Sequence, residues 1–447
     1  MSQRKQSKWS KKFNSRNLEE KKKEDPTRTR INPLRLMVIA QDSKDYNPRN
    51  YKPVDKGSDM LYYDNTNSKS TVAAELVDCT NSPLELTSTP AKDVYIFPQL
   101  ARIVLLHKDK MEEHNGMCLK KIQKSHSVAH HVADSLYKSS PYLLDPDWLI
   151  CYELLHAFPK LMEHTLPTFI HFSDTTMPGS FILAIKNFFL NRKIPSEVKY
   201  GAISNLDYGG EDTYSTHSNH RNWWFMNESN DGNLSTHENV TNVIHRVGNM
   251  RVSMYTSLIP IPDKKYSGNE EEHYASHHLG TIVLGGSILR DGGGMIIKLY
   301  TTNTMFITSL IAMVEKLFGS VYISKPSSSS LHSYERFLVC TGYTKEDSII
   351  EHMMNRLKSW NFKNPEVELR TPLCTLRRTF TKCIMDISSI LDINTQTHNN
   401  LNLDYIANNN YETNLTKYAR RVKDMWIDIH GILEVVPETI RKHEKMD

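Results

Sequence analysis

One lysine in an apolar strand is the side chain of this sequence best suited to chemistry. Lys298 follows the glycine triplet 292–294 and lies in the otherwise hydrophobic run 295–300. Burial of an ammonium group is costly unless a carboxylate pairs with it, and Glu335, at the start of a later strand, is the natural partner. The pair could be structural, or it could lower the pKa of a substrate hydroxyl that is held against the lysine.

A short turn, Met177-Pro-Gly-Ser-Phe181, is the second candidate for a binding role. Gly179 allows a ligand to approach the backbone just before a helix begins, and helix N-termini present unpaired N–H groups. In open α/β sheets, ligands bind at the carboxyl ends of the strands, where the strand order reverses. Taken alone, this motif is better explained as an ordinary strand-to-helix turn.

The elements that must position these residues follow from hydrophobic periodicity. Strands are predicted at 168–172, 198–203, 250–255, 295–300, 321–324 and 337–340, and helices at 148–158, 182–190, 279–289 and 304–318. Because strands and helices alternate, we expect an α/β fold with a mostly parallel sheet that helices cover on both faces. Two amphipathic helices, over 373–391 and 415–433, are expected to close the chain.

Length and composition exclude several classes of protein. The 447 residues are 39% hydrophobic and 24% charged, which is ordinary for globular proteins and excludes collagen, coiled coil and disorder throughout. The sequence lacks an apolar run of membrane-spanning length and an apolar signal core, so we expect a soluble intracellular protein of the nucleus or cytoplasm. The cysteines are scattered, which favours reduced thiols over disulfides or a zinc site.

The basic charge is concentrated at the N-terminus. Residues 1–32 carry 11 Lys or Arg against 4 acidic residues, a net +7, whereas the remaining chain is near −3. With almost no apolar side chains, this tail is expected to be disordered, and it could serve nuclear targeting or attraction to phosphates, or merely solvate the protein. Residues 33–94 are polar and rich in turn-forming residues, so irregular structure is expected there.

Two further groups of residues have chemical alternatives. Histidines at i, i+4 spacing could ligate a metal, but they lack an HExxH motif or a thiolate, so no metal site is predicted; they are His126, His130, His131, His273, His277 and His278. The pair Trp223-Trp224 could stack on a nucleic-acid base, and it could equally fill a core.

An ordered set of blocks between residues 148 and 343 resembles the FtsJ-type (RrmJ-like) ribose 2′-O-methyltransferases. The blocks are MPGSFILAIKNFF, GAISNL, NWWFMNESNDGNLS, GGGMIIKLYTTNT and VYISKPSSSSLHSYERFLVCTGY. They are most similar to the adrift-type branch, which methylates the second transcribed nucleotide of capped mRNA, and to relatives in large DNA viruses. The resemblance implies a Rossmann-like methyltransferase domain at 95–365, capped mRNA as the RNA substrate, and a viral replication site if a virus encodes the chain. The two amphipathic helices predict a helical extension at 366–447, through which we expect protein partners to bind.

The resemblance also implies a cofactor site and part of a catalytic site. The residues expected to hold S-adenosylmethionine are Pro178, Gly179, Ser180, Phe181, Asn205, Asp231 and Asn233. The family transfers a methyl group to a ribose 2′-hydroxyl, a group that distinguishes RNA from DNA, with a Lys-Asp-Lys-Glu tetrad. The third and fourth members of the tetrad fall on Lys298 and Glu335.

The other two members of the tetrad are replaced. Leu258 stands where the family has its Asp, and Ile150 where it has its first Lys. An apolar side chain cannot orient Lys298 against a hydroxyl, and compensation by Asp263, Asp231 or Lys138 is less expected than loss of activity. Three functions stay open: a cap 2′-O-methyltransferase homologue, an inactive RNA-binding or scaffolding subunit that retains the fold, and an assembly protein that binds neither ligand.

Overall fold

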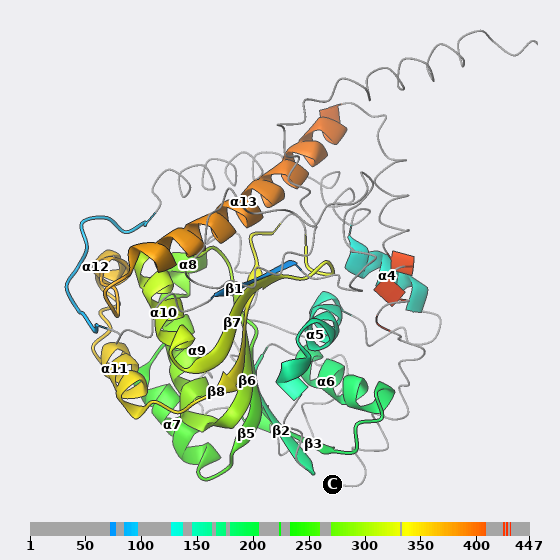
Figure 1. Ribbon diagram of the computed structural model, residues 1–447, viewed down its shortest axis with the longest axis horizontal. Coiled ribbons are helices and arrows are strands. Elements are labelled where there is room, and N and C mark those ends of the chain that lie inside the picture. Colours follow the sequence, from blue (N-terminus) through cyan, green and yellow to red (C-terminus); the bar gives the residue numbers. More distant parts are fainter. Residues whose placement is uncertain are drawn as a thin grey trace, which may run out of the picture. The chain divides into compact units, whose positions relative to one another are not determined.

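An eight-stranded sheet organises the described part of the chain (Figure 1). The computed structural model describes residues 72–76, 85–96, 127–136, 145–162, 167–175, 179–204, 223–224, 233–259, 270–330 and 333–407, and a few residues between 423 and 430. By its contacts the chain divides into Met1–Asn32 and Pro33–Asp447, and every described element belongs to the second unit. The basic tail and the segments around Asn205 and Asp231 lie outside the described residues.

The strand order is β1-β7-β8-β6-β5-β2-β3-β4. The strands are β1 (Val72–Leu76), β2 (Thr168–Asp174), β3 (Glu197–Ile203), β4 (Trp223–Trp224), β5 (Val252–Ser257), β6 (Leu289–Leu299), β7 (Phe318–Lys325) and β8 (Arg336–Tyr343). Strands β6, β5, β2, β3 and β4 are parallel, and β8 runs antiparallel between β6 and β7. The order reverses between β2 and β5, so their carboxyl ends form the switch point at which α/β sheets bind ligands.

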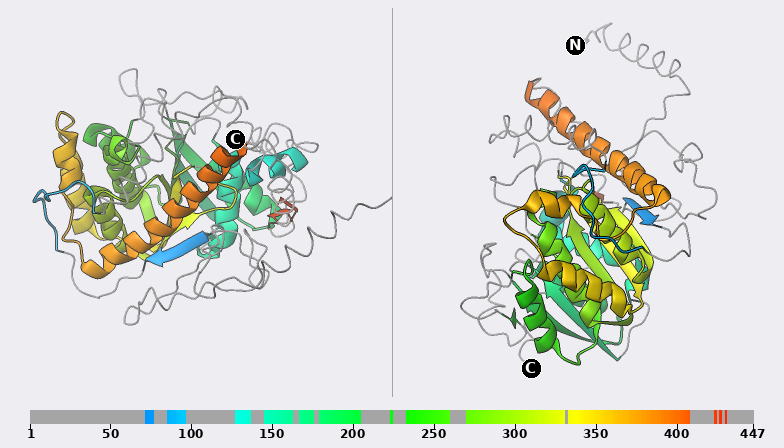
Figure 2. Two further views of the ribbon diagram at one scale, coloured as in Figure 1. Left: turned by 90° about the horizontal axis from the view of Figure 1, so that it is seen from above. Right: turned by 90° about the vertical axis from the view of Figure 1, so that its left-hand side faces the viewer.

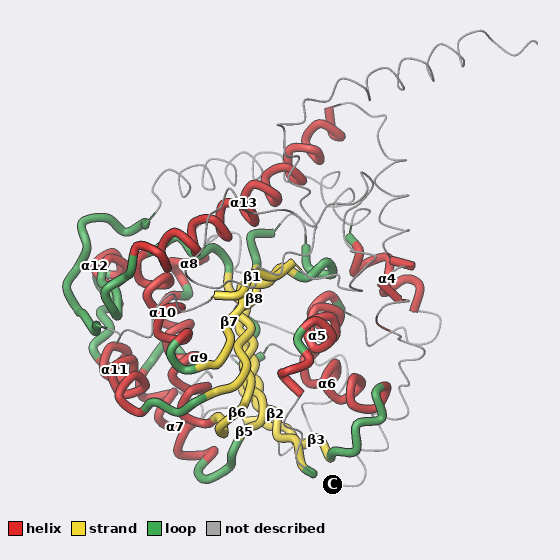
Figure 3. Tube along the Cα trace, viewed as in Figure 1, coloured by secondary structure: helices red, strands yellow, loops and turns green. Residues whose placement is uncertain are grey.

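Helices cover both faces of the sheet, as the alternation of elements predicted (Figures 1 and 3). On one side lie α5 (Pro146–Ala157) and α6 (Ser180–Asn191), with α4 (Val128–Leu136) beside them. The helices on the other side are α7 (His237–Val247), α9 (Ala275–Ile288), α10 (Met305–Glu315) and α11 (Asp347–Lys358), and the short elements are η2 (Pro159–Met162), α8 (Glu270–His273) and α12 (Pro365–Arg370). The Rossmann-like α/β fold expected from the sequence is therefore the observed one.

Side chains of β6 alternate between two hydrophobic cores. Met295 and Ile297 belong to the core under α7, α9, α10 and α11, whereas Ile296 belongs to the core under α5 and α6. Because side chains on a strand point to alternate faces, Lys298 shares the face of Ile296 and points toward the α5 side.

The glycine triplet lies within a strand and not in a loop. The sequence predicted a helix up to residue 289, a turn through Asp291 and the glycines, and a strand from Met295, but β6 begins at Leu289. A side chain at Gly293 would meet the backbone oxygens of Arg290 and Ser253 at 2.8 and 3.2 Å, so only glycine allows β5 to approach this closely.

Segments at both ends of the chain join the sheet. The region 33–94, expected to be irregular, contains β1, which pairs antiparallel with β7. Helix α13 (Arg378–Ala407) lies beside β1 (Figure 2), and its apolar residues Ile384, Ile387 and Leu391 enter the core of the sheet domain. This stripe serves the chain's own core, and docking of protein partners on the C-terminal helices stays a prediction. The second C-terminal helix expected, over 415–433, lies mostly outside the described residues.

Two further expectations concern membranes and cysteines. Among the described residues, no helix has the length and apolar character needed to cross a bilayer. The cysteines in the same ranges are free and buried: Cys151, Cys340, Cys374 and Cys383.

Candidate active site at the carboxyl edge of the sheet

A buried ion pair lies at the carboxyl end of β6. The Nζ of Lys298 is 3.0 Å from Oε2 of Glu335, and the two side chains are only 4% and 6% exposed. Burial alone would lower the pKa of Lys298, but the carboxylates of Glu335 and Asp147 outweigh it and hold that pKa above its ordinary value. The lysine is therefore an ammonium ion at neutral pH, and it cannot act as a base.

The pKa of Glu335 changes in the opposite direction. Burial alone would raise it, but the ammonium groups of Lys298 and Lys325 lower it below the ordinary value. The other carboxylate oxygen, Oε1, accepts a hydrogen bond from the backbone N–H of Ser330 at 3.1 Å. Glu335 is thus ionised and held at both oxygens.

Apolar side chains occupy the two positions at which the family resemblance would place an Asp and a Lys. Ser257 pairs with Ile297 in the parallel ladder of β5 and β6, so Leu258 lies beside Lys298 where the two strands end. Leu258 and Ile150 are buried in the same hydrophobic core, on the α5 side of the sheet.

A third charged group, Asp147, reaches the ion pair from α5. Its Oδ1 lies 3.9 Å from Nζ of Lys298, and its side chain is 33% exposed. Burial raises the pKa of Asp147, Lys298 opposes this shift, and Glu335 adds to it. Asp147 lies one helical turn before Ile150 and on the same helix face. This turn of α5 therefore carries a carboxylate close to Ile150, the position at which the family has its first Lys.

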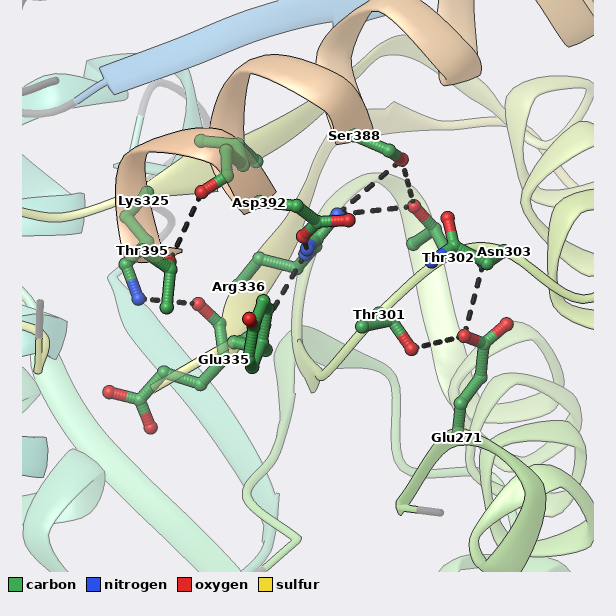
Figure 4. A network of polar contacts seen from close by, with 12 residues as sticks. Glu271, Thr301, Thr302, Asn303, Lys325, Glu335, Arg336, Ser388, Asp392 and Thr395 are labelled. Carbon is green, nitrogen blue, oxygen red and sulfur yellow. Dashed lines mark hydrogen bonds and ion pairs between the residues drawn. The ribbon is translucent and has the colours of Figure 1, made fainter. Parts of the chain in front are cut away.

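The loop between β7 and β8 holds Glu335 in place (Figure 4). Nζ of Lys325 donates hydrogen bonds to the backbone oxygens of Ser330, Ser333 and Glu335, at 2.8, 2.7 and 2.9 Å. Burial lowers the pKa of Lys325 to about 8. Because its three protons are donated to three carbonyls near Glu335, Lys325 fixes the backbone that carries the Glu335 carboxylate.

Helix α5 is fastened to the same loop through a buried carboxylate. The side chain of Glu153 accepts hydrogen bonds from the backbone N–H groups of Ser327 and Ser328, at 2.7 and 2.9 Å, and from both of their hydroxyls. It also accepts one from the indole N–H of Trp426 at 3.0 Å. Asp147 and Glu335 are therefore carried by two elements that are bonded directly to each other.

Helix α5 also contacts the turn that follows β2. Asp145 is its N-cap and accepts a hydrogen bond from the backbone N–H of Trp148 at 2.7 Å. The other oxygen of Asp145 accepts a hydrogen bond from the hydroxyl of Ser180, the first residue of α6. Burial and the charge of Asp147 raise the pKa of Asp145 to about 6. The first turn of α5 thus joins the Gly179 turn to the Lys298 ion pair.

Comparison with protein families agrees with this geometry. A model of the FtsJ-like methyltransferase family matches residues 212–343, a range that includes β5, β6 and β8 with Lys298 and Glu335. This chain contains an FtsJ-like methyltransferase domain.

Curated relatives that match this chain carry methyltransferase names. The protein named "Probable methyltransferase EP424R" of African swine fever virus (Badajoz 1971 strain) is 28% identical over 208 residues, which cover 43% of this chain and 47% of that protein. The cap-specific mRNA (nucleoside-2'-O-)-methyltransferase 2 of Drosophila melanogaster is 22% identical over 240 residues, covering 51% of this chain and 33% of the relative. The methyltransferase domain is homologous to cap 2′-O-methyltransferases, and the chain spans less than half the length of these relatives.

A solved structure, a ribosomal RNA methyltransferase of Plasmodium falciparum, also matches part of the chain. The match covers 44% of this chain and 97% of that one, at 15% identity and a TM-score of 0.30. At this TM-score the match supports no conclusion about this chain.

Some of the residues expected to hold the methyl donor of this methyltransferase domain lie in the described part. Gly179 has φ 82° and ψ 44°, a left-handed conformation that favours glycine, and α6 starts directly after it. The first N–H groups of α6 have no carbonyl within the helix, which suits a polar ligand. Phe181 is buried, and Ser180 faces Asp145. The predicted members outside the described residues are Pro178, Asn205 and Asp231.

Asn233 is engaged in its own turn. Its Oδ1 accepts a hydrogen bond from the backbone N–H of Ser235 at 2.9 Å, and its backbone oxygen accepts one from the side chain of Asn239 at 2.7 Å. Asn233 therefore shapes the start of α7, and its side-chain oxygen is already used within the protein.

Among the described residues no cluster of three His, Cys, Asp or Glu side chains suited to a metal ion is found, and His126 lies outside these residues. Nε2 of His277 lies 3.0 Å from Oδ2 of Asp174, a carboxylate that also accepts a hydrogen bond from Ser257. Burial lowers the pKa of His278 to about 3. These histidines belong to the packing between α9 and the sheet.

Three carboxylates near the candidate site were not predicted from the sequence: the N-cap Asp145, and Asp147 and Glu153 of α5. The signal for Asp145 was present, because an Asp followed by Pro is a common helix start. Asp147 could have been suspected, since it lies three residues before Ile150 and so on the same helix face. No sequence signal linked Glu153 to the serines that it binds.

Proposed function

We propose that this chain is an S-adenosylmethionine-dependent methyltransferase that acts on ribose 2′-hydroxyls of capped mRNA. The observation that carries the proposal is the Lys298–Glu335 ion pair, buried at the sheet edge that also carries the Gly179 turn. The names of the cap-specific relatives support capped mRNA as the substrate. We assign residues 95–365 to the catalytic domain and 366–447 to a helical extension, and the enzyme would work in the nucleus, the cytoplasm or a viral replication site.

S-adenosylmethionine, when bound, would supply a sulfonium methyl group to the hydroxyl oxygen and leave as S-adenosylhomocysteine, while the hydroxyl proton passes to water. The residues that would hold it are those of the turn Pro178–Phe181 together with Asn205, Asp231 and Asn233. Lys298 would donate a hydrogen bond to the ribose oxygen and stabilise the negative charge that develops there. Glu335 keeps the ammonium charged and aimed, a role that its own hydrogen bond to Ser330 makes rigid.

A second function is supported by the apolar replacements. Leu258 and Ile150 lie in the hydrophobic core, at the positions of the family's Asp and first Lys. An inactive RNA-binding or scaffolding subunit that retained the methyltransferase fold would tolerate both changes.

Binding and transfer measurements distinguish the two functions. We expect the full chain to bind S-adenosylmethionine in a calorimetric titration and to transfer a radiolabelled methyl group from it to a capped RNA oligonucleotide with unmethylated riboses. The substitution Lys298→Met should lower the rate of transfer about 100-fold or more, because the stabilising charge at the ribose oxygen is lost.

Lys345→Met is the matched control, because Lys345 also forms an ion pair, with Asp347 at 2.6 Å, but is 44% exposed. It should leave transfer unchanged, and thermal melting must show that both variants are folded. Binding of donor or RNA without transfer would favour the scaffolding function, and the absence of both kinds of binding would contradict both functions.

A further inference from the structure

Two carboxylates face one ammonium group at the candidate active site. Glu335, at 3.0 Å, already neutralises Lys298, and Asp147 at 3.9 Å adds a second negative charge. A buried charge is stable when it is paired. Glu335 also interacts with the ammonium group of Lys325, so Asp147 is distinguished by its position beside Lys298 and not by a surplus of negative charge.

The three side chains differ in their access to solvent. Lys298 and Glu335 are 4% and 6% exposed, whereas Asp147 is 33% exposed. Asp147 is thus the member of the trio that solvent reaches. It is the carboxylate beside Lys298 that a substrate could contact.

Hydrogen bonds on two sides hold the helix that carries Asp147. Asp145 ties this turn to Ser180 at the start of α6, and Glu153 ties the next turns to Ser327 and Ser328. The neighbouring residues of α5, Trp148 to Leu155, are buried. This framework sets the spacing between the Gly179 turn and Lys298, which is the geometry that a transfer between two ligands requires.

From these contacts we infer that Asp147 is the positioning carboxylate of this methyltransferase: it orients the ammonium group of Lys298 toward the substrate hydroxyl. It takes the place of an acidic residue at the end of β5, where Leu258 lies. The required charge has thus moved from a strand end to the first turn of a helix. This inference rests on the proposed function.

The test compares a variant that loses the charge of Asp147 with one that keeps a carboxylate on a side chain one methylene longer. Asp147→Asn removes the charge, and Asp147→Glu retains a carboxylate in the first turn of the helix. Transfer to capped RNA, the KM for S-adenosylmethionine and the melting temperature are measured for both in the full chain. We expect Asp147→Asn to lower kcat roughly 10- to 100-fold with an unchanged KM for the donor, and Asp147→Glu to retain most of the activity.

The matched control is Asp347→Asn. Asp347 also lies in the first turn of a helix, α11, beside a lysine, but it is 81% exposed and outside the site. It should leave kcat unchanged. If the wild-type chain transfers methyl groups and Asp147→Asn transfers them at the same rate, this inference alone is overturned. An equal loss of kcat in the Asn and Glu variants has the same consequence. A wild-type chain that transfers none overturns the proposed function and this inference together.

Discussion

Asp145 gives the candidate site a pH-dependent stability. Its pKa is raised to about 6 in the folded protein, from an ordinary value near 3.8. Between these values the folded chain holds a proton that the unfolded chain has released, so the free energy of unfolding falls as the pH rises from about 4 to about 6. Above this window the loss is complete.

Asp145→Asn should abolish this dependence. Asn is as good an N-cap as Asp and cannot ionise, so the variant should gain stability relative to wild type, on the order of 1–2 kcal/mol, between pH 4 and pH 6. Urea unfolding at both pH values measures it, with Asp347→Asn as the exposed control. A difference between variant and wild type that does not change with pH would show that the carboxylate ionises normally.

At the level of single residues, the sequence predicted well which charged side chains are buried. It predicted less well which of these side chains contact one another. Lys298 and Glu335 were paired in advance because a lysine in an apolar strand needs a carboxylate. Asp147 was not, since an Asp in the first turn of a helix is ordinarily explained by the helix dipole.

Helix α13 is attached to the sheet by a buried ion pair next to the candidate site. Arg336 of β8 pairs with Asp392 of α13, and both side chains are almost completely buried. Figure 4 shows Arg336 reaching toward α13 while the carboxylate of its neighbour Glu335 points the other way. Attachment of the C-terminal helix and placement of Glu335 therefore depend on adjacent residues of one strand.

Asp392→Asn should destabilise the protein by about 3–5 kcal/mol, because Arg336 would keep its charge in the core without a counter-ion. Urea unfolding measures this loss. The double variant Arg336→Met/Asp392→Leu should recover most of it, since apolar side chains of similar volume can replace a buried pair. A single variant that costs less than about 1 kcal/mol would show that other contacts hold α13 in place.

The elements themselves were largely predictable. Most of the strands and helices from β2 to β8 follow from hydrophobic periodicity, but β4 and α7 were not predicted in this way, and β6 begins at Leu289 instead of Met295. Strand β1 was not predicted, because a short edge strand in a polar segment has no periodicity of its own and gains its hydrogen bonds only from β7.

At the scale of the whole molecule, the charge of the N-terminal tail can be tested as a contribution to RNA binding. Residues 1–32 carry a net charge of +7 while the remaining chain is near −3. Replacement of Lys21, Lys22 and Lys23 by Gln should weaken binding to capped RNA and reduce the slope of log K against log salt by up to about 2, because fewer counterions are released.

Fluorescence anisotropy of labelled RNA at several salt concentrations measures the slope. Lys345→Gln, a change of one exposed lysine, is the control for loss of charge in the folded domain. An unchanged slope in the triple variant would show that the tail only solvates the protein.

The sequence alone determined the class of fold, the edge of the sheet on which the candidate site lies, and the buried lysine within that site. The class of fold and the sheet edge follow from hydrophobic periodicity and from the order of strands and helices. The buried lysine follows from the cost of burying a charge. Each of these can be judged from residues that are close together in the sequence. Only the tertiary structure decided that Asp147 lies beside Lys298, and that Asp145 and Glu153 fasten its helix to Ser180 and to the β7–β8 loop. Such contacts depend on how α5 packs across the sheet, and that packing is the sum of many weak interactions between residues distant in sequence.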